Sequence, residues 1–134
     1  MCAPTTSRRR GFSLPDECLF CSIVGNGTYV RKAKGFVAIE DINPKAEVHL
    51  LVLPERHVDT FRDVSEFPAK EAKRMLDFIA ETAESVGLQD YRILVNVGPG
   101  AGQTVFHLHW HLLGGKLDLD SLQSLAAAQE VAVL

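Results

Sequence analysis

The chain has 134 residues, which is enough for one domain with a single hydrophobic core. Hydrophobic residues make up 46% and charged residues 23%, the balance of an ordinary globular protein, and the formal net charge of −3 argues against a surface for nucleic acid polymers. No apolar run follows Arg8, Arg9 and Arg10, so we expect neither a secretory signal nor a membrane anchor. A cytoplasmic protein is the expectation, with nuclear or organellar targeting as alternatives.

Three segments are expected along the chain. Residues 1–15 lack acidic residues and are predicted to be a disordered tail, and residues 16–115 are predicted to form the domain itself. Residues 116–134 form a C-terminal extension, in which the stretch 117–133 is expected to be helical. No internal repeat or linker divides the chain, so we expect one domain with two extensions.

The first half of the domain predicts one short helix and several strands. The apolar stretch 19–24 ends at Gly25-Asn26-Gly27, which favours a short helix stopped by glycine, followed by an edge strand near residues 28–31. Residues 35–42 and 48–54 are rich in β-branched and aliphatic side chains and are joined by Asn43-Pro44-Lys45. An antiparallel hairpin is therefore expected here.

The second half predicts one long helix between strands. Apolar residues three or four apart from Ala72 to Val86 predict a helix over residues 68–86, ended by Gly87. Strands are expected over 91–97 and 104–113, separated by the glycine-rich loop 98–102. Because the strands follow one another instead of alternating with helices, the expected class is α+β with an antiparallel sheet.

Three of the five histidines in the chain stand at alternate positions, His107, His109 and His111. On a strand they share one face, while Leu108 and Trp110 share the other. Residues two apart on a strand are about 6.6 Å apart and residues four apart about 13 Å, whereas a metal–nitrogen bond is about 2 Å. Two of these rings can therefore share a metal but three cannot easily do so, which favours separate roles around one ligand.

The glycine-rich loop 98–102 leads directly into these histidines. Glycine lets backbone N–H groups approach an anion closely, so the loop is suited to phosphate oxygens. A glycine loop alone is weak evidence, because many are simple hairpin connections. Together, the loop and the histidines indicate attack on a phosphate by an imidazole, which is a competent nucleophile when neutral.

These residues resemble the histidine triad (HIT) family, whose signature of alternating histidines and apolar residues matches the run from His107 to Leu113. The resemblance extends over residues 18–115, through the segments 41–44, 49–54 and 102–105, Asn96 and Gly114-Gly115. It implies an α+β fold with about five antiparallel strands, one long helix and a short N-terminal helix. It also implies a homodimer with a continuous sheet.

The glycine pair resembles the Hint branch, the purine nucleoside phosphoramidate hydrolases. The segment 101–104 looks as much like the fragile histidine triad branch, which cleaves dinucleoside polyphosphates, and both remain open. His111 favours hydrolysis, because related nucleotidyl transferases have glutamine at this position. A third alternative is a regulatory protein that binds an AMP-like or GMP-like purine nucleotide with little turnover.

The resemblance also assigns roles to residues. His109 would attack the α-phosphorus and form a nucleotidyl-histidine, with no cofactor needed for catalysis, and Asp41 would bind the ribose. The phosphate or leaving group would contact Asn96, Gly102, Gln103, Thr104 and His111. The base would lie among Leu19, Phe20, Ile23, Ile39 and Ile42, which ordinary core packing explains equally well.

Some family members hold a structural zinc ion, and the resemblance assigns its ligands here to Cys18, Cys21, His49 and His107. Two sulfur and two nitrogen donors suit tetrahedral zinc. The alternative is two small buried cysteines with both histidines hydrogen-bonded to the backbone. His57 is expected to be a surface residue. A purely structural zinc module is the weakest hypothesis, because it leaves Asp41, Asn96 and the glycine loop without a role.

Overall fold

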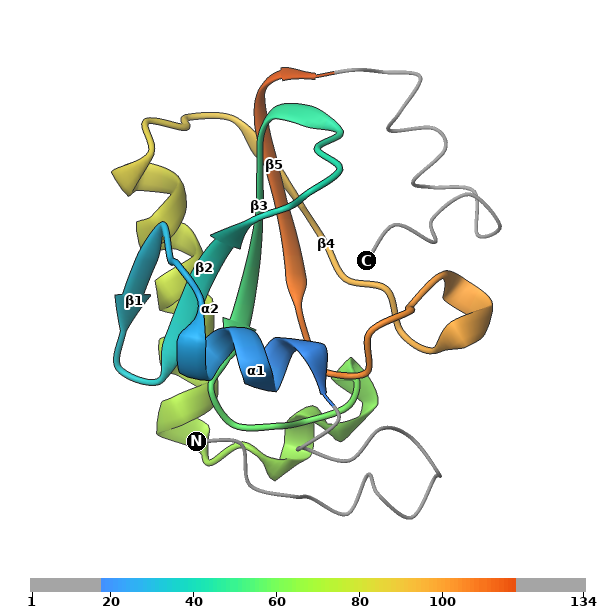
Figure 1. Ribbon diagram of the computed structural model, residues 1–134. Helices are drawn as coiled ribbons and strands as arrows, with labels where there is room; N and C mark the ends of the chain where they lie inside the picture. Colours follow the sequence, from blue (N-terminus) through green and yellow to red (C-terminus); the bar gives the residue numbers. More distant parts are fainter. Residues whose placement is uncertain (1–17, 118–134) are drawn as a thin grey trace.

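The computed structural model describes residues 18–117, which form a five-stranded antiparallel sheet with one helix on each face (Figure 1). The N-terminal tail and nearly all of the C-terminal extension lie outside the described residues, and so does the helix expected over 117–133. Within residues 18–117, no helix has the length and apolar character needed to cross a bilayer. The predicted α+β class and antiparallel sheet are confirmed.

The elements follow the predicted order. They are α1 (Leu19–Asn26), β1 (Arg31–Ala33), β2 (Phe36–Glu40), β3 (Ala46–Pro54), the 3₁₀ helix η3 (Phe61–Glu66), α2 (Ala69–Ser85), β4 (Tyr91–Leu94), the 3₁₀ helix η4 (Pro99–Ala101) and β5 (Trp110–Leu117). The predicted edge strand 28–31 is displaced, because it begins at Arg31. The α2 helix ends as predicted, with Gly87 at a φ of 81°.

The sheet order is β1-β2-β3-β5-β4, so the last strand lies between β3 and β4. Leu51 pairs with His111, and Leu94 pairs with the same histidine from the other side. His111, the last histidine of the triad, therefore lies on an inner strand of the sheet, and its backbone is fixed by a neighbouring strand on each side.

Each face of the sheet has its own core. Phe36, Ala38 and Val52 pack with Met75 and Phe78 of α2. On the opposite face, Val37, Ile39, Leu51 and Leu53 pack with Phe20 and Val24 of α1. Because side chains alternate along a strand, β2 and β3 are buried on both faces, against α2 on one face and α1 on the other.

The prediction of a strand from Thr104 is wrong for residues 104–109, because β5 begins only at Trp110. The backbone before it bends, and Leu108 N–H donates to the carbonyl of Val58 at 2.6 Å. The loop after β3 therefore takes up the backbone pairing that a longer strand would make. In this bent form, His107 can turn towards the start of α1 while His111 stays in the sheet.

Candidate active site

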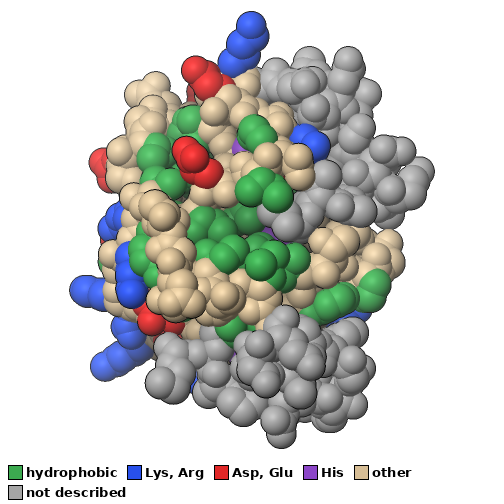
Figure 2. Space-filling model, in the orientation of Figure 1, with side chains coloured by type: hydrophobic (Ala, Val, Ile, Leu, Met, Phe, Trp, Pro, Cys, Tyr) green, Lys and Arg blue, Asp and Glu red, His purple; other side chains and the backbone are tan. Residues whose placement is uncertain are grey.

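The three triad histidines are all buried on the α1 face of the sheet, with exposed fractions of 2% or less. The rings of His109 and His111 have centroids 5.3 Å apart. Phe20 of α1 lies edge-on to His109 at 4.9 Å and to His107 at 6.2 Å. The predicted shared face is therefore present, although only His111 lies on the strand. Hydrophobic side chains gather at the centre of the visible face, with small patches of histidine between them (Figure 2).

A backbone contact sets the protonation of the His109 ring. Its Nδ1 lies 2.8 Å from the carbonyl oxygen of His107, which can only accept, so Nδ1 carries the proton. In the neutral ring the lone pair is then on Nε2. This is the nitrogen that a nucleophilic histidine needs to have unprotonated, and the neighbouring backbone fixes the orientation of the ring.

A second chain of hydrogen bonds orients His111. The Lys45 N–H donates to His49 Nδ1 at 2.9 Å, so the proton of His49 is on Nε2. That nitrogen lies 2.9 Å from His111 Nδ1, which must accept, and the proton of His111 is on Nε2. His111 Nε2 is buried and has no hydrogen-bond partner among the described residues. The relay therefore presents one N–H donor on the side of His109.

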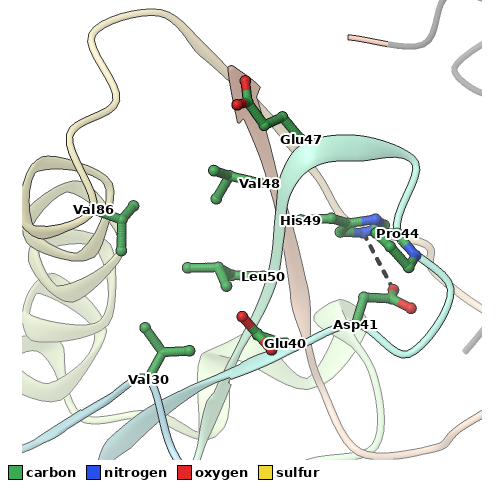
Figure 3. A pocket seen from close by; sticks show the side chains of 9 residues that line it. All are labelled: Val30, Glu40, Asp41, Pro44, Glu47, Val48, His49, Leu50 and Val86. Atoms are coloured by element: carbon green, nitrogen blue, oxygen red, sulfur yellow. Dashed lines mark ion pairs between the residues drawn. The ribbon is translucent and has the colours of Figure 1, made fainter. Parts of the chain in front are cut away.

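Asp41 completes this group. Its Oδ1 accepts from the Asn43 N–H at 2.7 Å, and its Oδ2 lies 3.2 Å from His49 Nε2 (Figure 3). Its side chain is buried, and Oδ2 has no hydrogen bond of good geometry within residues 18–117. Asp41 and His49 also line a hollow of about 270 Å³, together with Val48, Leu50 and Val86 among others (Figure 3). The contact of Asp41 with a ribose remains a prediction.

Burial keeps this group of rings neutral. Desolvation, with a smaller effect of His109 and His49, lowers the pKa of His111 to about 3. Desolvation also lowers the pKa of His49, partly offset by the nearby Asp41 carboxylate. A neutral His111 has only one N–H donor, so its orientation decides what it can contact.

The glycine loop adopts a 3₁₀ turn whose amides are largely satisfied internally. The N–H groups of Ala101 and Gln103 donate to the Gly98 carbonyl, and the Gly102 N–H donates to the Pro99 carbonyl. The predicted concave site for phosphate is therefore not built from these three amides. The N–H of the exposed Thr104 has no acceptor among the described residues and remains available.

Asn96 supplies a further buried donor close in sequence to the end of β4. It stands two residues after Leu94, which pairs with His111. Its Nδ2 is buried and has no hydrogen-bond partner among residues 18–117. Buried polar atoms are normally paired, so unpaired donors on Asn96 and His111 indicate a site for an anionic ligand.

The Gln103 side chain is hydrogen-bonded within the protein, and its contact with a phosphate remains a prediction. Its Oε1 accepts from the Gly98 N–H at 2.9 Å, and its Nε2 donates to the carbonyls of Asp59 and Val105 at 2.8 and 3.0 Å. Both protons of its amide are thus used within the protein. The residue holds the loop in place rather than pointing a free donor at a ligand.

The predicted base-binding residues divide into two groups. Phe20 and Ile23 of α1 pack with Ile39 of β2. Ile23 and Ile39 also line an open hollow of about 490 Å³. Leu19 and Ile42 are 50% and 77% exposed and do not belong to this cluster. Whether any of the five contacts a base remains a prediction.

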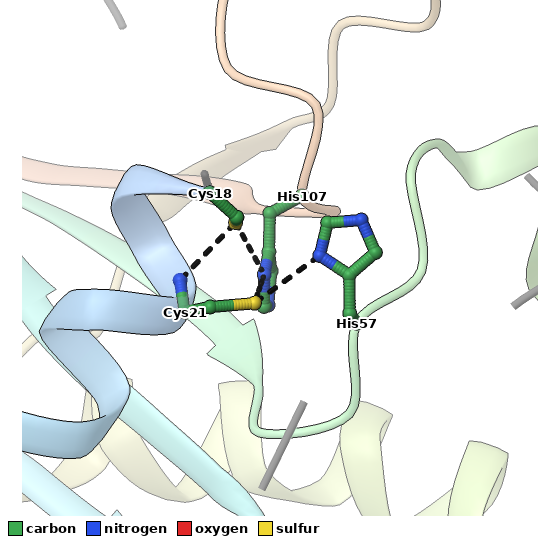
Figure 4. Close-up of side chains that lie close together, drawn as sticks. All are labelled: Cys18, Cys21, His57 and His107. Carbon is green, nitrogen blue, oxygen red and sulfur yellow. Dashed lines mark hydrogen bonds between the residues drawn. The ribbon is translucent and has the colours of Figure 1, made fainter. Parts of the chain in front are cut away.

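Four potential metal ligands meet at the start of α1, and one of them differs from the predicted set. They are Cys18, Cys21, His57 and His107, which we call the four-donor cluster (Figure 4). The assignment of His49 as a ligand is wrong, because His49 lies with Asp41 and His111. The expectation that His57 is exposed is also wrong, since it is fully buried. The spacing of His57 and Asp59, two residues apart and therefore on one side of an extended chain, is a signal that sequence analysis overlooked.

The distances within the four-donor cluster fit zinc. Cys18 Sγ lies 3.3 Å from His107 Nδ1, and Cys21 Sγ lies 3.2 and 3.4 Å from the Nδ1 atoms of His57 and His107. Bond lengths of about 2.3 Å to sulfur and 2.05 Å to nitrogen around a tetrahedral ion place these donors about 3.5 Å apart. Burial raises the pKa of the Cys18 thiol, partly offset by the Cys21 N–H that it accepts.

The tautomers distinguish this cluster from the Asp41, His49 and His111 group, which is equally compact. His107 Nε2 donates to the Pro54 carbonyl and His57 Nε2 to the Asp59 carboxylate, both at 2.7 Å. Both rings therefore turn an Nδ1 lone pair towards the sulfurs, as metal ligands do. In the other group, the Lys45 N–H forces a proton onto the very nitrogen of His49 that would have to bind a metal. Of these two groups in residues 18–117, the four-donor cluster is the one whose tautomers suit a metal ion.

The chain belongs to the HIT family, since the HIT domain model matches residues 25–118. An uncharacterized HIT-like protein of Helicobacter pylori is 44% identical over 82 residues, which cover 60% of this chain and 76% of that protein. The purine nucleoside phosphoramidase of Escherichia coli is 38% identical over 81 residues, covering 59% and 68%. The predicted family membership is confirmed.

Solved structures agree with this assignment. A HIT family hydrolase from Legionella pneumophila is 38% identical and superposes with a TM-score of 0.68, covering 74% of this chain and 93% of that one. A zinc-bound histidine triad family protein from Mycobacterium smegmatis is 26% identical with a TM-score of 0.61, covering 90% and 95%. The fold and the family support a nucleotide-binding hydrolase.

Proposed function

We propose that the protein hydrolyses purine nucleoside phosphoramidates, compounds in which an AMP-like phosphate carries an amine. The observation that carries the proposal is the tautomer of His109, whose Nδ1 is bound to the His107 carbonyl and whose lone pair is therefore on Nε2. The similarity to the phosphoramidase of Escherichia coli supports the substrate class. The activity is cytoplasmic on this proposal.

In the first step, His109 Nε2 attacks the α-phosphorus. A phosphorus–nitrogen bond to the ring forms as the bond to the leaving amine breaks. The leaving nitrogen takes one proton from solvent, and the water that attacks in the second step returns one proton to solvent. Asn96 Nδ2 and His111 Nε2 are the unpaired donors beside this position and would stabilise the charge on the phosphoryl oxygens. Thr104 offers its N–H from the opposite end of the loop.

In the second step, water attacks the phosphorus of the nucleotidyl-histidine. The bond to His109 breaks, the nucleoside monophosphate leaves, and the ring returns to its neutral form. Dividing one displacement into two steps lets the same donors serve both transition states. The chemistry needs no cofactor beyond these side chains.

The experiment compares hydrolysis of adenosine phosphoramidate by the wild type and His109→Ala, with mass spectrometry of acid-sensitive adducts after rapid quenching at neutral pH. We expect loss of turnover in the variant and an adenylyl group on His109 in the wild type. Wild-type turnover by His109→Ala would refute the mechanism. Faster hydrolysis of diadenosine polyphosphate would move the protein to the alternative substrate class, and AMP binding without turnover would indicate a regulatory role.

We also propose a structural zinc ion in the four-donor cluster. When bound, the ion would join the start of α1 to the loop after β3 and to the triad segment. His57 and His107 would bind through Nδ1, since their Nε2 atoms donate elsewhere. The similarity to a zinc-bound family member supports the assignment.

A homodimer completes the proposal. β4 lies at one edge of the sheet, and its Tyr91 and Ile93 side chains are 39% and 47% exposed. An unpaired edge strand with apolar side chains is a surface for pairing with a second strand. A second copy of β4 would extend the sheet across both subunits.

A further inference from the structure

Gln103 stands between the glycine loop and the four-donor cluster. Its Oε1 accepts from the Gly98 N–H, at the first residue of the glycine loop, and its Nε2 donates to the Asp59 carbonyl. The side chain is only 3% exposed, and Asp59 is fully buried. A buried amide that uses both of its protons and its carbonyl oxygen holds the backbone segments that it joins at a fixed separation.

The far end of this connection is the four-donor cluster. The Asp59 carboxylate accepts from His57 Nε2 at 2.7 Å, and the Nδ1 of the same ring faces Cys21. Asp59 therefore uses its side chain for the cluster and its backbone carbonyl for Gln103. A rotation of the His57 ring would displace Asp59, and Gln103 would transmit the shift to Gly98.

Gly98 is sensitive to such a shift. Its φ of 87° and ψ of 163° lie in a region that glycine alone adopts readily, and its carbonyl accepts the N–H groups of Ala101 and Gln103. The whole turn that precedes Thr104 is thus built on the position of Gly98. The Thr104 N–H, which has no acceptor among residues 18–117, follows directly after this turn, so its direction depends on the turn.

We propose that Gln103 is a positioning residue that connects the four-donor cluster to the glycine loop, so that the state of the cluster sets how tightly the loop holds a nucleotide phosphate. The inference rests on the proposed function in one respect, that the loop receives the phosphate. It assigns the cluster a part in substrate binding in addition to holding α1.

The test measures dissociation constants of AMP and adenosine by calorimetry, with the zinc-loaded full-length chain. The ratio of the two constants reports on the phosphate and cancels effects on the base and ribose. Gln103→Leu removes the connection, and Gln89→Leu is the matched control, because Gln89 is exposed and remote from the loop. The four-donor cluster itself is altered in two ways, by removal of zinc with a chelator or by Asp59→Ala, which removes the carboxylate that accepts from His57.

We expect Gln103→Leu to lower the preference for AMP over adenosine about three- to tenfold, the size of one or two lost hydrogen bonds, with no change in Gln89→Leu. Changing the cluster should lower the preference by a similar factor in the wild type but by less than about twofold in Gln103→Leu. Equal effects of the cluster change in both backgrounds would overturn the inference. So would Gln103→Leu behaving like its control.

A spectroscopic measurement covers the case in which zinc removal unfolds the chain. The amide proton and nitrogen signals of Gly98 and Gly102 should move in the Asp59→Ala variant and remain in place when Gln103→Leu is already present. Movement of the signals in both backgrounds contradicts the connection. If the enzyme has no turnover but the cluster change still acts on the loop through Gln103, only the proposed chemistry is contradicted. If turnover is present but the cluster change does not act through Gln103, only this inference is contradicted.

Discussion

His49 Nε2 lies 2.9 Å from His111 Nδ1, joining two buried rings on neighbouring strands. His111 pairs with Leu51 in the sheet, and His49 stands two residues before Leu51, so the two histidines are diagonal neighbours on one face. The contact determines which nitrogen of His111 carries the proton. A residue assigned to zinc by resemblance thus orients the N–H donor of His111, which we propose contacts the phosphate.

Replacing His49 should therefore impair turnover without affecting the metal. In His49→Leu, His111 loses the donor that fixes its tautomer, and we expect kcat for adenosine phosphoramidate to fall roughly 10- to 100-fold. His49→Gln keeps an N–H donor and should recover part of the loss. Steady-state kinetics of both variants test this, and equal rates for the two would count against a role for the tautomer.

Metal content should distinguish the ligand sets. We expect one zinc ion per chain after purification without chelators and with a phosphine reductant, measured by mass spectrometry of the metal. His57→Asn and Cys18→Ser should lose it, because each removes a donor of the four-donor cluster. His49→Asn serves as the control and should retain a full equivalent. Loss of zinc in His49→Asn with retention in His57→Asn would restore the set implied by resemblance.

Stability should fall as the solution becomes acidic. Burial lowers the pKa of His111 from 6.5 to about 3, so below pH 6.5 the unfolded chain binds a proton that the folded chain does not. This group therefore favours folding above pH 6.5, and its contribution is lost progressively from pH 6.5 towards 3. Between pH 6.5 and 5 the loss is on the order of 2 kcal/mol. Urea unfolding of the wild type and His111→Asn at both pH values tests this, and parallel curves would contradict it.

The glycine loop should tolerate a side chain at one position and not at another. A Cβ on Gly98 would lie 2.6 Å from Arg62 Nη2, and its φ of 87° is strained for other residues, so Gly98→Ala should cost about 1–3 kcal/mol. Gly100→Ala is the control, since nothing lies within 4 Å of a Cβ there. Adding Arg62→Ala to Gly98→Ala removes the close contact but leaves the backbone strain, so it should restore only part of the unfolding temperature.

The proposed dimer depends on the β4 edge. Ile93→Lys places a charge on an apolar side chain of that edge, so light scattering at micromolar concentration should show a monomer where the wild type is a dimer. Val30→Lys, next to the opposite edge of the sheet, is the control and should remain dimeric. A wild-type monomer would contradict the proposal directly.

Local patterns predicted the elements well, because helices and hairpins depend on neighbours in the chain. The helix 68–86 and the hairpin around Asn43-Pro44 follow from spacing and turn residues alone. The strand predicted over 104–113 was too long, because residues 104–109 alternate like a strand but the Leu108 N–H donates to Val58 in the loop after β3. Nothing local to the sequence reveals that competing partner.

The site was predicted in part for the same reason. The three histidines of the triad follow from the motif, and the pairing of Leu94 with His111 joins the end of β4 to it. Which of His49 and His57 is the potential metal ligand depends on which ring lies beside Cys18 and Cys21 at the start of α1. The path of the chain after β3 decides this, and the sequence alone does not show that path. Their roles in contact with substrate remain predictions.

The segment from Pro54 to Asp59 is hydrogen-bonded at three positions to the segment from Gln103 to Leu108. Pro54 holds the side chain of His107, Val58 pairs with Leu108, and Asp59 holds Gln103. Inserting or deleting one residue within either segment would shift the register of the two segments and break these hydrogen bonds together. The spacing of eight positions from His49 to His57 is therefore fixed by these contacts. We expect the same spacing in related chains in which the first histidine contacts His111 and the second belongs to the four-donor cluster.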